Sequence, residues 1–85
     1  MKLHLRFFAS VREKLDCSTL ELNLDDASIS ATQVRQRLID QGSPWDQALS
    51  FDRVLRMAVN QVMIEHDVQL KEGDELAFFP PVTGG

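Results

Sequence analysis

The sequence predicts an α+β fold in which a mixed sheet of about five strands packs on one main helix. Several short segments alternate apolar and polar residues, which is the period of a half-buried strand. One segment near the middle of the chain has helical spacing instead. The chain has 85 residues, enough for one domain with a single hydrophobic core. Strands on both sides of one helix indicate a layer of sheet packed on a layer of helix.

The first two strands are predicted close to the N-terminus. Leu3, Leu5 and Phe7 alternate with polar residues and are expected to point inward. Residues 20–24 repeat the pattern with leucine at every second position. The polar residues 10–18 lie between them, so we expect a hairpin with a long connection.

The main helix is predicted to begin after Ser30. Ser30 and Gln33 have the spacing of a capping box, and apolar residues follow at helical spacing as far as Leu38. Gly42 is expected to end the helix. Residues 44–51 can form a short second helix.

The remaining strands are predicted after this helical region. Residues 55–59 form a third strand, Asn60-Gln61 a turn, and Val62–Ile64 a fourth strand. The last strand is Glu75–Phe79, which ends at Pro80-Pro81 because proline has no N–H for strand pairing. This order and length resemble the ubiquitin-like β-grasp fold.

Some large apolar residues fall out of phase with the strands that contain them. If Val62 and Ile64 point inward, Met63 points outward, and the same alternation places Phe8 and Phe79 on the outer face. Scattered apolar residues are common on protein surfaces. Three large ones on one sheet face would form a patch of the kind that binds a partner. We therefore predict a docking surface at Phe8, Met63 and Phe79.

The chain divides into a predicted domain, residues 1–79, and an uncharged tail, residues 80–85. Two prolines stiffen the start of the tail, and Gly84-Gly85 at its end has no side chains. Extended, the tail spans about 20 Å, so it can thread a narrow channel and present the Gly85 carboxylate to another protein. The alternative is an ordinary frayed terminus.

Composition excludes several classes of function. The net charge of -4 and the pI of about 4.9 argue against nucleic acid and against anionic membrane surfaces as partners. No apolar stretch is long enough to span a bilayer. Cys17 is the single cysteine, so no intramolecular disulfide can form and a reducing, cytoplasmic location is expected.

The ending of the chain carries the most specific resemblance. Residues 78–85 read Phe-Phe-Pro-Pro-Val-Thr-Gly-Gly, which closely resembles the ThiS/MoaD family of sulfur carriers, above all the small subunits of molybdopterin synthase. Residues 19–24, the helix and residues 42–53 match in pattern only. The other matching segments are Phe7-Phe8-Ala9, Val11-Arg12-Glu13, Val59-Asn60-Gln61 and Leu70 with Gly73-Asp74-Glu75.

The resemblance implies a function for Gly85. A ubiquitin-activating-type adenylyltransferase would use ATP to adenylate it, and a sulfur-donating protein would supply the sulfur of a C-terminal thiocarboxylate. The tail, with Val82 and Thr83 between Pro80-Pro81 and Gly84, would then enter the large subunit of a heterotetrameric synthase. There the sulfur would pass to cyclic pyranopterin monophosphate in molybdenum cofactor biosynthesis.

By the same resemblance, Phe8, Met63 and Phe79 match the family's contact surface for both partners. The chain alone would be non-catalytic. It would bind no cofactor itself, since ATP is used by the activating partner, and it has no glycine-rich phosphate loop.

Other candidate groups are assigned ordinary roles. Cys17 has no histidine near it in sequence and is interpreted as an incidental thiol. His4 and His66 lack further ligands at metal-binding spacing. The acidic pairs Asp25-Asp26 and Asp74-Glu75 are interpreted as turn and cap residues.

Several alternatives stay open at this point. Arg12 can hold the tail, contact a partner or form a surface salt bridge. A thiamin-pathway carrier shares the fold and Gly-Gly, but such chains are typically shorter and lack the ending at residues 78–83. A ubiquitin-like modifier would join Gly85 to lysines, and a plain binding module would use the patch alone.

Overall fold

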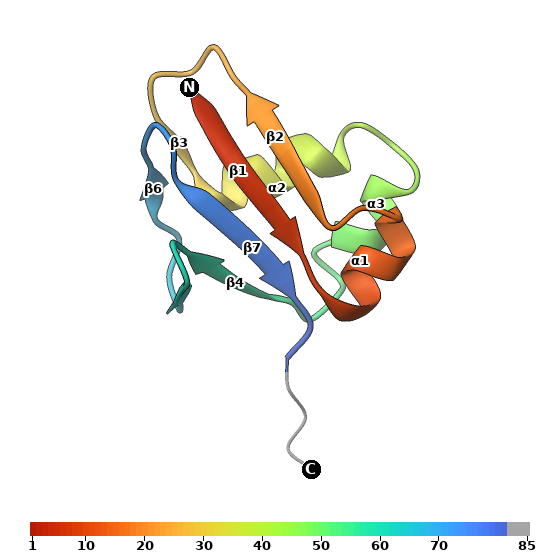
Figure 1. Cartoon of the computed structure of the whole chain (residues 1–85). Helices are drawn as coiled ribbons and strands as arrows, with labels where there is room; N and C mark the ends of the chain where they lie inside the picture. The colour runs from red at the N-terminus through yellow and green to blue at the C-terminus, as the bar shows by residue number, and fades with distance from the viewer. Residues whose placement is uncertain (82–85) are drawn as a thin grey trace.

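Five strands form one mixed sheet with the order β2-β1-β7-β4-β5 (Figure 1). The structure is a computed structural model, and it describes residues 1–81. A two-stranded sheet, β3-β6, lies apart from the main one. In chain order the elements are β1 (Lys2–Phe7), α1 (Ala9–Leu15), β2 (Thr19–Asn23), β3 (Ile29–Ser30), α2 (Ala31–Ile39), α3 (Trp45–Leu49), β4 (Arg56–Val59), β5 (Val62–Ile64), β6 (Gln69–Leu70) and β7 (Glu75–Phe79).

The first and last strands pair in the centre of the sheet. β1 and β7 run parallel, with Leu5 opposite Leu76 and Phe7 opposite Phe78. The other neighbours in the sheet are antiparallel. This mixed sheet around a central parallel pair, with α2 across one face, confirms the predicted ubiquitin-like β-grasp fold (Figure 1).

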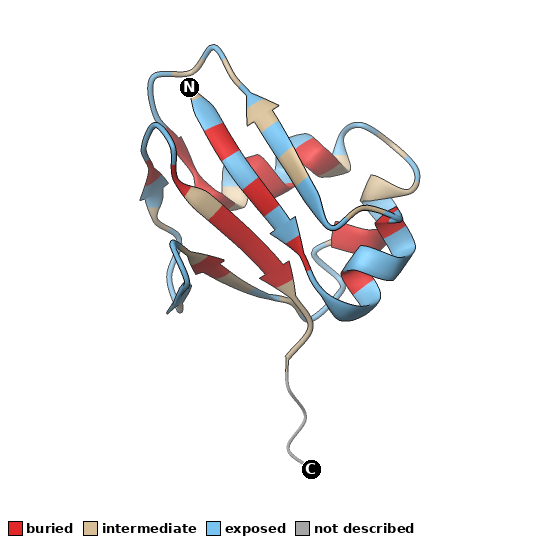
Figure 2. Cartoon of the chain, viewed as in Figure 1, coloured by how far each residue is buried: buried red, intermediate tan, exposed pale blue. Residues whose placement is uncertain are grey.

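The core lies between the sheet and the helices. Leu3, Leu5 and Phe7 are at most 1% exposed, as their alternation predicted. The rings of Phe7 and Phe78 stack with centroids 5.8 Å apart, and Trp45 at the start of α3 meets Phe7 edge-on at 5.9 Å. Figure 2 shows the resulting alternation of buried and exposed residues along β1. Strand β1 therefore has one face in the core and one face toward solvent.

The predicted capping box begins α2. Ser30 Oγ accepts a hydrogen bond from the Gln33 N–H at 3.1 Å, and Gln33 Oε1 accepts one from the Ser30 N–H at 2.9 Å. The helix ends at Ile39, before the predicted stop at Gly42. The physical reason is that the last backbone bonds, from Gln41 and Gly42, reach carbonyls three residues back and tighten the final turn. Gly42 then has a φ of +87°, which favours glycine.

The connection between β1 and β2 contains a helix that the sequence analysis missed. Residues 10–18 were predicted to be a polar connection, whereas Ala9–Leu15 form α1. Val11 and Leu15 lie one turn apart on it and are 2% and 8% exposed. Two apolar residues among polar ones are too weak a periodic signal to predict a helix. The antiparallel pairing of β1 with β2 is as predicted.

Val62 lies in the inner row of the sheet, as predicted, because register places it opposite Val59 and Val59 opposite the buried Leu76, but Val62 itself is not buried. Val62 is 67% exposed, and Ile64 is half-buried. β5 is the edge strand of the sheet, so its inner face lies at the margin of the core (Figure 1). The side chains of β5 alternate between the two faces as predicted, but the inner-face residues are less buried because β5 is at the edge of the sheet. The sheet formed by β3 and β6 was also not predicted, because strands of two residues are too short for period-two alternation.

The turn between β4 and β5 is held to the start of β7. Asn60 and Gln61 both have positive φ, 51° and 69°, as in a type I′ hairpin turn. The Asn60 amide donates to Asp74 Oδ1 at 3.0 Å, and the Glu75 N–H donates to Asn60 Oδ1 at 3.0 Å. The other Asp74 oxygen accepts from the Lys71 N–H at 2.8 Å. These bonds confirm the turn role predicted for Asp74-Glu75 and fix the hairpin.

We predict that Asp74→Asn lowers the free energy of unfolding at pH 7 by about 1.5–3 kcal/mol, the range for hydrogen bonds to a charged group. Burial disfavours the charged carboxylate, but the bonds from Asn60 and Lys71 outweigh it and lower the pKa of Asp74. The stabilisation is therefore complete above the unfolded pKa of about 3.9 and is lost as pH falls through the folded value.

Urea unfolding of both proteins at pH 7 and near pH 3 measures this difference. The exposed Asp40→Asn is the control and should change stability by less than about 0.5 kcal/mol. A gap between wild type and Asp74→Asn that widens at low pH would contradict the assignment.

Candidate functional site

The sheet face turned away from α2 carries a row of small and apolar residues. Strand register places Met63 opposite Ala58, Ala58 opposite Ala77, and Ala77 opposite Arg6. One row therefore crosses β5, β4, β7 and β1. In the view of Figure 1, α2 lies behind the sheet, so it does not cover this face.

A pair of aromatic rings lies at the end of the sheet from which the tail leaves. The rings of Phe8 and Phe79 meet edge-to-face, with centroids 6.5 Å apart. Pairing with β7 extends one residue beyond β1, because the Phe8 N–H donates to the Phe78 carbonyl at 3.1 Å. The Arg6 guanidinium stands 5.2 Å from the Phe8 ring centroid, within cation–π range.

Together these residues form an apolar surface, called here the sheet-face patch and defined as Phe8, Ala58, Met63, Ala77 and Phe79. Phe8 is 38% exposed and Met63 is 53% exposed. Phe79 is half-buried, because the Phe8 ring covers part of it. Ala58 and Ala77 connect Met63 to the aromatic pair but are only 8% and 5% exposed, so the accessible area of the patch comes from Phe8, Met63 and Phe79.

The outward positions predicted for Phe8, Met63 and Phe79 agree with the structure. Sequence reasoning missed the two arginines on this face. Arg6 lies 3.8 Å from Glu75, and Arg56 is opposite Phe79 in register. The signal was available, since Arg6 is two residues from Phe8 and so shares its face. An apolar centre beside charged residues is the anatomy of a protein–protein contact surface.

The root of the tail lies at the margin of the patch. β7 ends at Phe79, and Pro80 and Pro81 follow half-buried. The predicted tail residues Val82, Thr83, Gly84 and Gly85, including the candidate reactive carboxylate, lie outside the described residues. The sheet-face patch and the start of the tail are therefore adjacent.

The other candidate groups have no shared site within residues 1–81. The Cys17 thiol is half-buried and donates to the Thr19 carbonyl at 3.1 Å. His4 and His66 belong to no group of three or more metal-ligating side chains in that range. Arg12 is exposed and forms no ion pair with the residues described, which leaves its other two interpretations open.

None of the helices described is long and apolar enough to cross a membrane.

Comparison with known proteins shows the family. The model of the ThiS family matches residues 5–85, nearly the whole chain. The chain belongs to the ThiS family. A relative from Haemophilus influenzae named molybdopterin synthase sulfur carrier subunit is 41% identical over 83 residues, which cover 98% of this chain and 99% of that one. A relative of the same name from Escherichia coli is 44% identical over 79 residues, covering 93% and 94%.

Solved structures show the same fold at lower identity. Small archaeal modifier protein 1 from Haloferax volcanii superposes with a TM-score of 0.76 at 21% identity, over the full length of both chains. A chain from the complex of subunits 1 and 2 of the molybdopterin-converting factor from Helicobacter pylori superposes with a TM-score of 0.67 at 24% identity, again over both full lengths. These two likenesses establish the β-grasp fold and nothing further.

Two neighbouring phenylalanines test the assignment of the sheet faces. Phe78 is fully buried, and Phe79 faces out. We predict that Phe79→Asp lowers the free energy of unfolding by no more than about 1.5 kcal/mol, whereas Phe78→Asp prevents folding, because it buries an unpaired charge. Circular dichroism and urea unfolding measure both. Equal damage from the two substitutions would show that the faces are misassigned.

Proposed function

We propose that this chain is the sulfur-carrier subunit of molybdopterin synthase and that its reactive group is the carboxylate of Gly85. The proposal rests on the match to two proteins of that name, which are 41% and 44% identical over nearly the full length of the chain. The sequence ending at residues 78–85 and the apolar patch beside the tail root support it. On its own the chain is non-catalytic, since it supplies the sulfur while its partners supply the active sites.

The first step is activation of Gly85. A carboxylate is a poor electrophile, so an adenylyltransferase of the ubiquitin-activating type joins it to AMP from ATP and releases pyrophosphate. The terminal sulfur of a persulfide on a donor protein then attacks the carbonyl carbon, and AMP leaves. A thiol cleaves the remaining S–S bond, which yields the thiocarboxylate and a disulfide. Activation divides one difficult substitution into easier ones.

The second step is delivery of the sulfur. The thiocarboxylate enters the active site of the large subunit, where its sulfur bonds to a carbon of cyclic pyranopterin monophosphate and displaces an oxygen substituent. Water then hydrolyses the thioester between Gly85 and the pterin, which leaves the sulfur on the pterin and regenerates the carboxylate of Gly85. Two such subunit pairs form the heterotetramer. Residues 80–85 span about 20 Å when extended, enough to reach a buried site while the domain remains outside.

The sheet-face patch supplies affinity for both partners in this proposal. The edge-to-face aromatic pair presents apolar area with few rotatable bonds, and the exposed, unbranched Met63 side chain can adapt to the surface that it contacts. The clamp between Asn60 and Asp74 fixes the hairpin that bears Met63, so the patch is organised before binding.

We predict that the chain gains about 16 Da when it is incubated with ATP, its adenylyltransferase and a sulfur donor, because one oxygen is replaced by sulfur. Intact-mass spectrometry measures the gain. Removing Gly85, or adding one residue after it, should abolish the gain and leave the unfolding curve unchanged. If the adenylyltransferase is shown to be active and the mass does not change, the carrier function is contradicted. Covalent attachment of the chain to lysines of other proteins would instead indicate a modifier.

We also predict that Met63→Asp weakens binding to the large subunit at least about tenfold, because it places a charge in the apolar patch. Val62→Asp is the matched control. Val62 is the preceding residue on β5 and is similarly exposed, 67% against 53%, but it lies on the other face. Calorimetric titration of both variants measures the affinities. Equal weakening by the two would place the contact at the edge strand instead of on the sheet face.

A further inference from the structure

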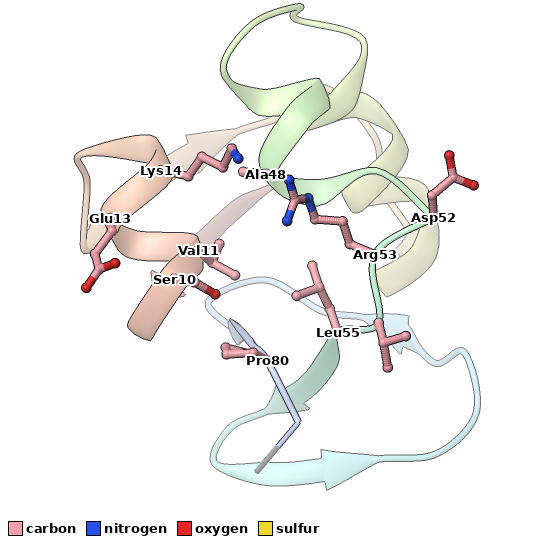
Figure 3. A pocket seen from close by; sticks show the side chains of 10 residues that line it. Ser10, Val11, Glu13, Lys14, Ala48, Asp52, Arg53, Leu55 and Pro80 are labelled. Carbon is pink, nitrogen blue, oxygen red and sulfur yellow. The ribbon is translucent and has the colours of Figure 1, made fainter. Parts of the chain in front are cut away.

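A groove lies on the side of the tail root opposite to the sheet-face patch. Side chains alternate along an extended chain, so Pro80 points away from the face that carries Phe79. Pro80 lines a groove of about 830 Å³ together with Val11 on α1 and the segment that leads into β4. In Figure 3 the side chains of Val11, Leu55 and Pro80 form its apolar wall.

The cationic side chains of the groove point into it, whereas its carboxylates point away. Figure 3 shows the ends of Lys14 and Arg53 directed toward the same part of the groove, beside Ala48. The carboxylates of Glu13 and Asp52 lie at its two outer sides and point away. Neither cation has a carboxylate within ion-pair distance among residues 1–81. Two adjacent cations without a counter-charge would attract an anionic group.

The Arg53 side of the groove is held in place from within the fold. Arg53 Nε donates to the Gln47 carbonyl at 2.6 Å, which orients the guanidinium. The two terminal nitrogens take no part in that bond and can donate to another group. The buried Arg35 on α2 donates to the carbonyls of Leu49 and Ser50 at 2.7 Å and to that of Arg53 at 3.2 Å. The loop is therefore tied to the core by a single side chain. A preorganised cation loses less entropy on binding than a mobile one.

The loop also presents an exposed apolar residue. Val54 lines the groove and is 74% exposed, although it is the neighbour of the more buried Leu55. A groove lined by an exposed branched apolar side chain and by two cations suits a segment that bears both an acidic and an apolar side chain.

We propose that this groove is a second docking surface, which binds an extended segment of the large subunit bearing a carboxylate side chain next to an apolar one. The inference rests on the proposed function, because a channel that admits the tail must surround its root. The sheet-face patch would contact one wall of the channel entrance, and the groove would contact the opposite wall. The carboxylate would pair with Lys14 and Arg53, and the apolar side chain would cover Val54 and Pro80.

Two other occupants fit the groove less well. A second copy of this chain has a net charge of -4, so self-association would work against repulsion between the copies. The terminal carboxylate of Gly85 is an anion within reach, but in the proposed function it lies in the active site of the partner. The groove is therefore assigned to the large subunit.

The test is titration of the large subunit with the full chain carrying Lys14→Glu or Arg53→Glu. Each should bind about fivefold to tenfold more weakly than wild type, and the dependence of affinity on salt between low and high ionic strength should become shallower. Arg37→Glu makes the same charge change on an exposed residue of α2 outside both the groove and the sheet-face patch, and it should stay within about twofold of wild type. Circular dichroism checks the fold of each variant, and Lys14→Glu carries the test if Arg53→Glu is destabilised.

Three results would overturn the proposal. The first is unchanged affinity of both groove variants. The second is an equal loss in Arg37→Glu, which would indicate a general charge effect. The third is a shift of groove NMR signals in the free chain when Gly85 is deleted, which would place the tail there. If the thiocarboxylated chain still donates its sulfur in these cases, only the groove assignment fails; if wild type neither gains sulfur nor binds the large subunit, the proposed function fails with it.

Discussion

The parallel pairing of β1 with β7 is the constraint on which the rest of the structure depends. It joins the two ends of the chain in the centre of the sheet, with Phe7 stacked on Phe78 in the core. The residue after each of these strand positions necessarily faces outward, and this brings Phe8 against Phe79. One register therefore determines both the stacked aromatic pair in the core and the aromatic pair on the surface.

The same pairing explains why the tail leaves beside the sheet-face patch. β7 is covered by a neighbour on both sides, so its last residue is held firmly, and two prolines then prevent the pairing from continuing. In the proposed function the domain needs no cleft for a substrate, because the reactive group would be carried to a partner's site. What the domain must supply is a rigid start for the tail and surfaces that position it, and the patch and the groove lie on opposite sides of that start.

The central strands and the start of the main helix were predictable from local patterns in the sequence. Alternation at Leu3, Leu5 and Phe7, and the capping box at Ser30, reflect local physics and were confirmed. Helix α1 escaped detection because its buried face consists of only Val11 and Leu15. The exposure of Val62 and the arrangement of Lys14 with Arg53 depend on which strands form an edge and which loops meet, and no local pattern contains that information.

The central claim is that Gly85 carries sulfur to the large subunit, and discharge of a loaded chain tests it most directly. The thiocarboxylated chain would be mixed in a single turnover with the large subunit and cyclic pyranopterin monophosphate, and its intact mass would be followed with time. The account predicts a loss of about 16 Da from the chain that matches the dithiolene sulfur formed, as sulfur leaves and the carboxylate returns. Dithiolene formation while the chain keeps its sulfur would contradict it.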